Sequence, residues 1–330
     1  MADVIVIGAG AAGLAAAREL HDRGVEATVL EARDRVGGRA MTSYDLAPHP
    51  VELGAEFVHG ENVATWSWIE RFSLETVDDA NQPVYFTYAE ERLWNATDAA
   101  RRPNTAAVGS IEARARREAE RRGPDYSIAD ALGTWIDFWP QDPSDDDVRL
   151  LRNAFAELHA ADLEDVGIAG ILEATYAGDG DRTHCRLADG YSVLLGRAAQ
   201  DLDVRFGAVV HSIAWQEDGV VVHAGDSHFE SKHAIITLPL GVIQSGEVMF
   251  DPPLPAEKLA AIESLGAGNI GKIALRFREQ FWEEDFSFLL TTLPTQLWWR
   301  PGEGHRGESP ILTAFFGGRD ADRFGKMPHD

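Results

Sequence analysis

Three glycines, Gly8, Gly10 and Gly13, stand at the spacing that a dinucleotide-binding turn requires. They follow the short β-branched run Val4–Ile7, which predicts a buried parallel strand, and precede Leu14–Leu20, whose composition predicts a helix. In this context the first glycine permits a tight turn, the second lets a pyrophosphate approach the backbone, and the third lets the helix pack on the sheet. The helix N-terminus adds unpaired N–H groups and a positive dipole end. We therefore expect these residues to contact a dinucleotide: Gly8, Gly10, Ala12 and Gly13.

An acidic residue, Glu31, follows the second predicted strand, Ala27–Leu30. A carboxylate at this position accepts hydrogen bonds from a ribose diol and repels the 2′-phosphate of NADP. An ordinary βαβ turn that binds nothing is the alternative, and the motif alone does not choose between NAD and FAD. The chain continues into a second glycine-rich loop with arginines on both sides, which suits a further contact with phosphate or with a ring system: Arg33, Gly37, Gly38 and Arg39.

Two segments near the amino end and one far from it resemble the flavin-containing amine oxidases, which include polyamine and monoamine oxidases, L-amino-acid oxidases and histone lysine demethylases. The first two read EARDRVGGR, from Glu31 to Arg39, and ELGAEFVHG, from Glu52 to Gly60. The third, Ile236–Trp282, contains LPLGV, PPLP and a lysine before a strand that ends in Phe-Trp. This third segment is similar to the polyamine-oxidase version of the family.

The resemblance implies an α/β fold in which a Rossmann-type FAD-binding domain (βαβ, GxGxxG) carries an inserted α+β substrate-binding domain. We expect residues 1–75 and 185–240 to form the FAD-binding domain, and residues 76–184 and 241–330 to form the substrate-binding domain. A length of 330 residues is sufficient for two domains. The family closes its flavin site with a Gly-rich C-terminal segment that we do not find before Asp330. Since the family's covalent flavin cysteine lies in that segment, FAD is expected to bind noncovalently.

The resemblance assigns the chemistry to two side chains. Lys272 stands at the start of a predicted strand in a chain with only four lysines. The family's matching lysine holds a water next to flavin N5, and a cation there stabilises negative charge on the reduced flavin. His59 matches the position that holds the amine chain in polyamine oxidases, and a histidine can titrate near the working pH and so select the neutral amine. The alternatives are a surface ammonium group for Lys272 and a structural hydrogen bond in a loop for His59.

The resemblance places further residues of this chain at the flavin. Gly54 and Ala55 are expected to bring the backbone against the isoalloxazine ring, and Val210 to lie against the adenine. Glu56 is expected to offer a backbone contact rather than to act as a base, because an amine that loses hydride from its α-carbon needs no strong base.

The net charge and the amino-acid composition limit the kinds of molecule that the protein is expected to bind. A net charge of −24 disfavours nonspecific binding to nucleic acid or to anionic membranes, and it is compatible with a cationic substrate. Cys185 is the single cysteine, so neither an intrachain disulfide nor a Cys-type zinc site fits. The histidines show no metal-binding spacing. Neither a signal peptide nor an apolar run of ~20 residues is found, which predicts a cytoplasmic protein without a membrane span.

Residue patterns predict the remaining elements. Asn62–Phe72 is expected to be an amphipathic helix, and Ile111–Arg122 a strongly charged helix within an inserted helical block. Two short strands, Val204–Val210 and Gly219–Ala224, are expected to be joined through His211–Asp218. A mixed sheet is expected from three later strands: Ile273–Phe277, Ser287–Thr291 and Ile311–Phe316.

Together these features predict an FAD-dependent oxidase that converts an amine to an imine, with O₂ reoxidising the flavin to give H₂O₂. Polyamines or acetylated polyamines are the leading substrates because of the segment Ile236–Trp282. An L-amino-acid oxidase is the nearest alternative, and it requires an arginine for the substrate carboxylate. An inactive, truncated module that binds FAD or a protein partner is the alternative from a different class. A dehydrogenase that uses NAD is the third.

Overall fold

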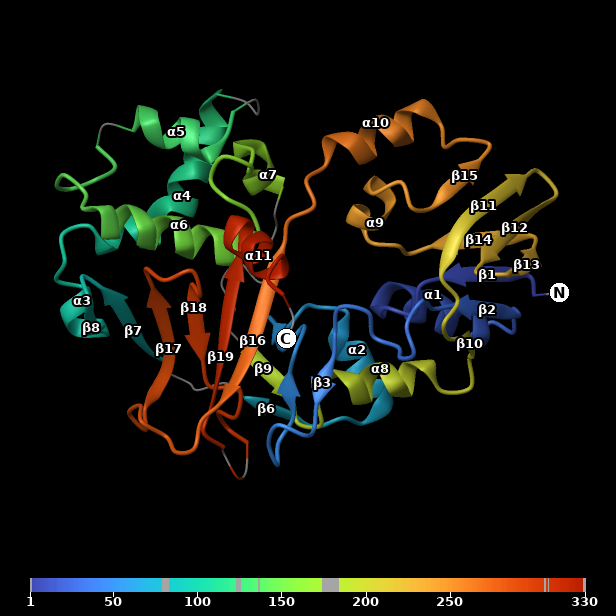
Figure 1. Cartoon of the computed structure of the whole chain (residues 1–330), viewed down its shortest axis with the longest axis horizontal. Helices are drawn as coiled ribbons and strands as arrows, with labels where there is room; N and C mark the ends of the chain where they lie inside the picture. The colour runs from blue at the N-terminus through green and yellow to red at the C-terminus, as the bar shows by residue number, and fades with distance from the viewer. Residues whose placement is uncertain are drawn as a thin grey trace.

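The computed structural model describes residues 2–78, 83–122, 126–135, 137–173, 184–305, 307 and 309–328. The nucleotide motif lies on an all-parallel sheet, at the right of Figure 1, whose strands in spatial order are β10 (Asp203–Arg205), β2 (Ala27–Leu30), β1 (Val4–Ile7) and β14 (His233–Ile236). All of β1 is buried, which confirms the predicted strand. Helix α1 (Ala11–Asp22) begins directly after the glycine turn and packs against α8 (Tyr191–Ala199). The α/β class with a Rossmann-type sheet is therefore confirmed.

A second sheet lies beside the first and consists of β13 (Ser227–Ser231), β12 (Gly219–Ala224), β11 (Val210–Gln216) and β15 (Met249–Asp251) in spatial order. The prediction that His211–Asp218 only joins two strands is wrong, because most of this segment is β11 itself. Strand β11 pairs with β12 and buries Ile213 opposite Val222. A bulge between Val210 and Ser212 interrupts the alternation of side chains, which is why the period-two pattern misplaced the strand.

The third sheet has six strands, at the left of Figure 1, and holds Lys272. In spatial order they are β16 (Ile270–Arg276), β19 (Ile311–Gly317), β18 (Leu297–Trp299), β17 (Phe286–Thr291), β7 (Val84–Ala89) and β8 (Arg92–Asn95). Strands β17 and β7 are parallel, whereas the other neighbouring pairs are antiparallel, so the predicted mixed sheet is confirmed.

Helices pack on and around this third sheet, and all of them except the first share one apolar core with Ala89 of β7. They are α3 (Ala96–Ala99), α4 (Thr105–Arg122), α5 (Ile128–Thr134), α6 (Asp145–His159) and α7 (Ile168–Glu173). The charged helix predicted at Ile111–Arg122 is the greater part of α4. Its small residues Ala115 and Ala119 are buried one turn apart beside Ile111, so one narrow stripe packs, while Arg117 and Glu120 are exposed and Glu118 is buried.

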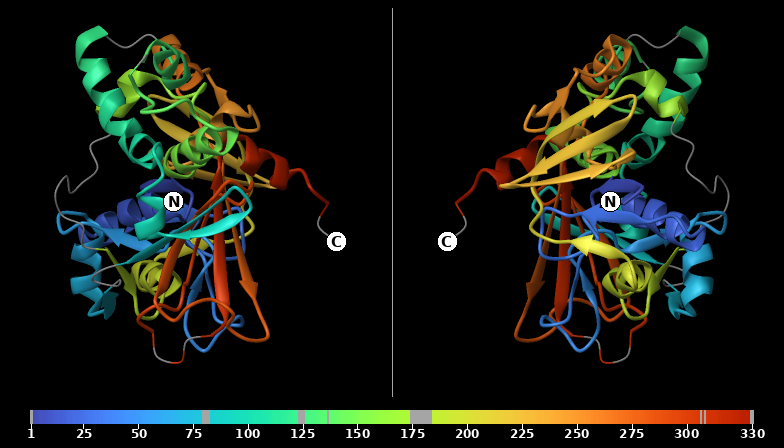
Figure 2. Two further views of the ribbon diagram at one scale, coloured as in Figure 1. Left: turned by 90° about the vertical axis from the view of Figure 1, so that its left-hand side faces the viewer. Right: turned by 90° about the vertical axis from the view of Figure 1, so that its right-hand side faces the viewer.

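Two small sheets connect the larger ones and carry the motif ELGAEFVHG. The first pairs β3 (Thr42–Ser43) with β4 (Val51–Glu52), and the second is ordered β5 (Phe57–His59), β9 (His184–Leu187) and β6 (Thr76–Asp78). The remaining helices are α2 (Thr65–Phe72), α9 (Leu240–Gln244), α10 (Ala256–Ser264) and α11 (Gly318–Gly325). In the side views of Figure 2, α11 and the C-terminal end project from the body of the protein. None of the helices in the described ranges is both long and apolar enough to cross a membrane.

One acidic side chain of α6 gives a direct test of this packing. Glu157 lies near the C-terminal end of the helix, where the dipole disfavours a carboxylate, and burial raises its pKa from 4.5 to about 7. A folded pKa above the unfolded one means that stability is lost as the pH rises through this range. We expect Glu157→Gln to raise the free energy of unfolding by about 1–2 kcal/mol at pH 8 and to leave it nearly unchanged at pH 4. Urea unfolding at the two pH values measures this, and an equal effect at both would contradict it.

Candidate active site

The three glycines of the first loop have different surroundings. A Cβ at Gly13 would lie 1.8 Å from the carbonyl oxygen of Gly8, and one at Gly8, whose φ is +102°, would lie 2.8 Å from Oγ1 of Thr237. A Cβ at Gly10 would have nothing within 4 Å. Gly10 is the N-cap of α1, and Ala12 is exposed in the first turn. Gly8 and Gly13 therefore permit close packing, whereas open space lies in front of Gly10, where a pyrophosphate fits.

Glu31 ties the first loop to the second. Its side chain is buried, and Oε2 accepts a hydrogen bond from the backbone N–H of Ala9 at 2.8 Å. Oε1 accepts another from the N–H of Arg33 at 3.0 Å. Nη1 of Arg33 donates to the carbonyl oxygen of Gly38, and a Cβ on Gly38 would lie 3.3 Å from the Cα of Gly10. The two glycine-rich loops are thus held against each other with Glu31 between them.

The sequence analysis did not predict a role for Arg35, although this residue belongs to the same EARDRVGGR segment. Its guanidinium group donates to the carbonyl oxygens of Val36, Gly38 and Ala40, and so fixes the second loop from within. The side chain of Arg39, by contrast, is exposed. Arg39 therefore remains accessible to a phosphate, whereas Arg35 is committed to the backbone.

Val210 lies near the same loops. It begins β11 and packs in the core beneath the first sheet, whereas the preceding Val209 is 56% exposed. The segment before it is anchored to Glu31, whose carbonyl oxygen accepts a hydrogen bond from the N–H of Ala208 at 2.9 Å. The chain thus brings Val210 to the loops that follow β1 and β2.

The third loop, around Gly54, packs on the second. The N–H of Ala55 donates to the carbonyl oxygen of Arg39 at 3.2 Å, and a Cβ on Gly54 would lie 2.0 Å from that same oxygen. Glycine is required here by this close approach. Ala55 itself is exposed beside the loop of Arg39.

Lys272 reaches the third loop from the six-stranded sheet. Its Nζ donates to Oε2 of Glu56 at 2.6 Å and to the carbonyl oxygen of Gly54 at 3.1 Å, and it lies 5.0 Å from the ring centroid of Trp299. The Lys272 side chain is 6% exposed and that of Glu56 is 2% exposed. The alternative of a surface ammonium group is therefore excluded, and Lys272 is the third residue of β16 rather than a strand terminus.

The carboxylate of Glu56 is the centre of a buried charge cluster. Nε of Arg186 and Nε1 of Trp299 both donate to Oε1 of Glu56 at 2.9 Å. Burial raises the pKa of Glu56, but the charges of Lys272 and Arg186 together with their hydrogen bonds outweigh it and hold the pKa below its usual range. Glu56 is accordingly ionised. Sequence reasoning missed Arg186 and Trp299, although a single arginine between the apolar residues Cys185 and Leu187 was an available signal.

His59 lies at the edge of this cluster. Its side chain is exposed at the end of β5, and its ring centroid is 5.7 Å from that of Phe57. Phe57 in turn lies 6.0 Å from Trp299. Phe57 and His59 lie on one side of β5 because side chains two positions apart in a strand point the same way. The rings of Phe57 and Trp299 therefore lie in a series between His59 and Lys272.

Glu52 precedes the third loop and is hydrogen-bonded to neighbouring elements. Its Oε1 accepts from the N–H of Tyr191 at 2.7 Å and its Oε2 accepts from Oγ1 of Thr42 at 2.9 Å, which joins α8 to β3 and β4. Burial raises the pKa of Glu52 to about 7, although both hydrogen bonds and Lys272 act in the opposite direction.

Because the pKa of Glu52 is raised in the folded protein, ionisation of its buried carboxyl group above pH 7 destabilises the folded state. Its unfolded pKa is near 4.5, so the folded state loses stability as the pH rises from 4.5 to about 7. At pH 8 we expect Glu52→Gln to raise the free energy of unfolding by about 1–2 kcal/mol and so to unfold at a higher temperature than the parent. The amide removes the buried negative charge and still retains one acceptor oxygen. The difference should disappear at about pH 4, below the unfolded pKa, where Glu52 is largely protonated in both states. Thermal unfolding followed by circular dichroism at both pH values decides, and a destabilised variant at pH 8 would refute the assignment.

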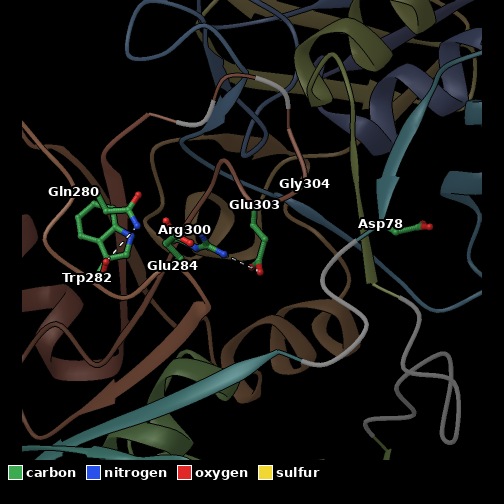
Figure 3. A pocket seen from close by; sticks show the side chains of 7 residues that line it. All are labelled: Asp78, Gln280, Trp282, Glu284, Arg300, Glu303 and Gly304. Atoms are coloured by element: carbon green, nitrogen blue, oxygen red, sulfur yellow. Dashed lines mark hydrogen bonds and ion pairs between the residues drawn. The ribbon is translucent and has the colours of Figure 1, made fainter.

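A polar cavity of about 870 Å³ lies elsewhere, in the loops that follow β16 and β18. Figure 3 shows the residues that line it, none of which is a predicted site residue: Asp78, Gln280, Trp282, Glu284, Arg300, Glu303 and Gly304. Arg300 follows Trp299 directly in the chain and forms an ion pair with Glu303 at 3.1 Å. This cavity is therefore separate from the predicted nucleotide loops, and it adjoins the charge cluster through Arg300, next to Trp299, and through Asp78, which pairs with Cys185 beside Arg186.

Several known proteins are similar to this chain in sequence. The family profile described as Flavin containing amine oxidoreductase matches residues 11–330. Lysine-specific histone demethylase 2 of Homo sapiens is 30% identical over 320 residues, which cover 85% of this chain and 35% of the demethylase. Polyamine oxidase 4 of Oryza sativa subsp. japonica is 30% identical over 297 residues, which cover 84% of this chain and 60% of the oxidase. The chain thus spans only part of the length of these relatives.

The fold is similar to that of a solved amine oxidase. Cyclohexylamine oxidase from Brevibacterium oxydans IH-35A superposes with a TM-score of 0.81 at 22% identity, over 99% of this chain and 78% of that chain. The open space at Gly10, the buried Glu31 and the packed second loop fit the dinucleotide part of FAD. The chain therefore belongs to the flavin containing amine oxidoreductase family, whose cofactor is FAD.

Proposed function

We propose that this chain serves in the FAD-dependent oxidation of amines, with polyamines as the substrate class. One observation carries the proposal: the ammonium group of Lys272 is buried and held at the Gly54–Glu56 loop. When bound, FAD would supply the oxidising chemistry, a two-electron oxidation of the carbon next to the amine nitrogen, with O₂ as the final electron acceptor and H₂O₂ as its product. The imine that the substrate becomes is then hydrolysed to an aldehyde and an amine.

The residues proposed to hold FAD noncovalently come from the three packed loops and from the start of β11. The first loop suits the pyrophosphate, Glu31 the ribose, Val210 the adenine and the Gly54 loop the isoalloxazine ring. The full set is Gly8, Gly10, Ala12, Gly13, Glu31, Arg33, Gly38, Arg39, Gly54, Ala55, Glu56 and Val210.

Two catalytic roles are proposed. Lys272 uses two of its three N–H groups to bond Glu56 and Gly54, and the third has no acceptor within the described part of the chain. That third N–H can hold a water beside the reacting ring, and the positive charge stabilises negative charge that develops there. His59, exposed at the end of β5, would bind the amine and favour its neutral form.

The domain division and the substrate class complete the proposal. Residues 1–75 and 185–240 are assigned to FAD binding, and residues 76–184 and 241–330 to substrate binding. The separation of the parallel sheet from the six-stranded sheet supports this division, although β15 pairs with β11 beside the first sheet. Similarity to a polyamine oxidase and a net charge of −24 support a cationic substrate.

A flavin spectrum combined with a peroxide assay tests this proposal. The purified chain should be yellow and should release H₂O₂ with spermine, and an L-amino acid should give none. Yellow protein without peroxide from any amine would favour a module that binds FAD or a partner. Peroxide from L-amino acids alone would favour the amino-acid oxidase. Colourless protein that binds a nicotinamide nucleotide would reverse the cofactor assignment.

A further inference from the structure

Arg186 is the charged residue of the cluster to which no role has been given. It lies on β9, directly opposite Phe57 of β5, and its side chain is 3% exposed. Nε donates to Oε1 of Glu56 at 2.9 Å, and the guanidinium carbon lies 4.4 Å from the centroid of the Phe57 ring. Burying a guanidinium group is costly unless its charge is compensated, so its contact with Glu56 calls for an explanation beyond packing.

The charges of the three side chains provide that explanation. Lys272 and Glu56 alone, at 2.6 Å, form a neutral pair whose field falls off quickly outside the pair. Arg186 adds a second positive charge on the other carboxylate oxygen, and the three side chains together then carry a formal charge of +1. Trp299 also donates to that oxygen but contributes no charge.

We propose that Arg186 is a positioning residue for Lys272: by binding Glu56 it offsets the charge of the carboxylate, so that the cluster presents a net positive charge to the flavin. This inference rests on the proposed function. The carboxylate fixes the ammonium group in place, and Arg186 prevents the same carboxylate from cancelling the ammonium charge. A net positive charge beside the reacting ring also disfavours a bound alkylammonium ion relative to the free amine. Glu52 and His305 are further titratable groups of this neighbourhood.

The formal charge of the cluster in the parent and in three variants distinguishes the proposed electrostatic role of Arg186 from a role in packing alone. The parent cluster carries +1, Arg186→Met carries 0, Glu56→Gln carries +2, and the double variant Glu56→Gln/Arg186→Met returns to +1. In the chain without flavin, Glu56→Gln should lower the folding equilibrium constant about a hundredfold or more, because two buried cations lose their partner. Removing Arg186 as well should restore at least about tenfold of this loss, since one of those cations is gone. Urea unfolding gives all four values, and Arg197→Met, which removes an exposed arginine of α8, is the matched control.

The flavin-loaded chain provides the second readout, the midpoint potential of the bound flavin measured without any amine. Arg186→Met should make flavin reduction about tenfold less favourable, whereas Arg186→Lys and the double variant should stay close to the parent. A double variant less stable than Glu56→Gln, or equal potentials in the parent and Arg186→Met, would overturn the inference. A chain that binds FAD but oxidises no amine would instead sink the proposed function, because the potentials do not depend on substrate.

Discussion

Lys272→Met should lower the rate of amine oxidation about a hundredfold to a thousandfold while the chain still folds and binds FAD. The size of the effect follows from the proposed place of this buried cation beside the reacting ring, where charge develops during the reaction. Folding should survive because Glu56 keeps a charged partner, since Nε of Arg186 donates to it at 2.9 Å. Stopped-flow measurement of flavin reduction by spermine and of reoxidation by O₂ separates the two half-reactions.

Lys258→Met is the control for that experiment. Lys258 is exposed on α10 and belongs to neither the loops nor the cluster. Its removal subtracts the same charge from the chain and should leave both half-reactions at the rates of the parent. Equal rates for Lys272→Met and the parent, with flavin bound in both, would remove Lys272 from the mechanism.

Gly13→Ala should destabilise the fold, whereas Gly10→Ala, the same substitution three residues earlier, should not. The new Cβ at Gly13 would lie 1.8 Å from the carbonyl oxygen of Gly8, so the backbone of the turn or of α1 must move. We expect a loss of about 3 kcal/mol or more in the free energy of unfolding. At Gly10, whose φ is −75°, the Cβ would meet nothing within 4 Å, so the chain without flavin should be as stable as the parent.

Although Gly10→Ala should leave the stability unchanged, it should weaken the binding of FAD. Its methyl group enters the space proposed for the pyrophosphate, and the affinity for FAD should fall about tenfold or more although the fold is intact. Fluorescence titration with FAD measures the affinity, and urea unfolding of the flavin-free chain measures the stability. If Gly10→Ala binds FAD as tightly as the parent, the pyrophosphate lies elsewhere.

Local patterns were sufficient to predict the first strand and the glycine turn that follows it. Val4–Ile7 is β1 as predicted, and Gly8, Gly13 and Glu31 make the contacts that such a turn requires. This succeeded because every determinant lies within about thirty residues and depends on short-range backbone geometry. The same kind of reasoning misplaced β11, where a bulge at Val210 breaks the period of two.

The sequence by itself determined the family and the parallel strand with its glycine turn, and it predicted a catalytic role for Lys272. The tertiary structure alone decided what Lys272 contacts. Glu56 comes from the loop before β5, Arg186 from β9 and Lys272 from β16. They meet because β5 pairs with β9 in one particular register while β16 reaches the same loop. Ion pairs between residues so distant in the chain leave no periodic trace in the sequence, since their geometry depends on how separate sheets dock and not on local propensity.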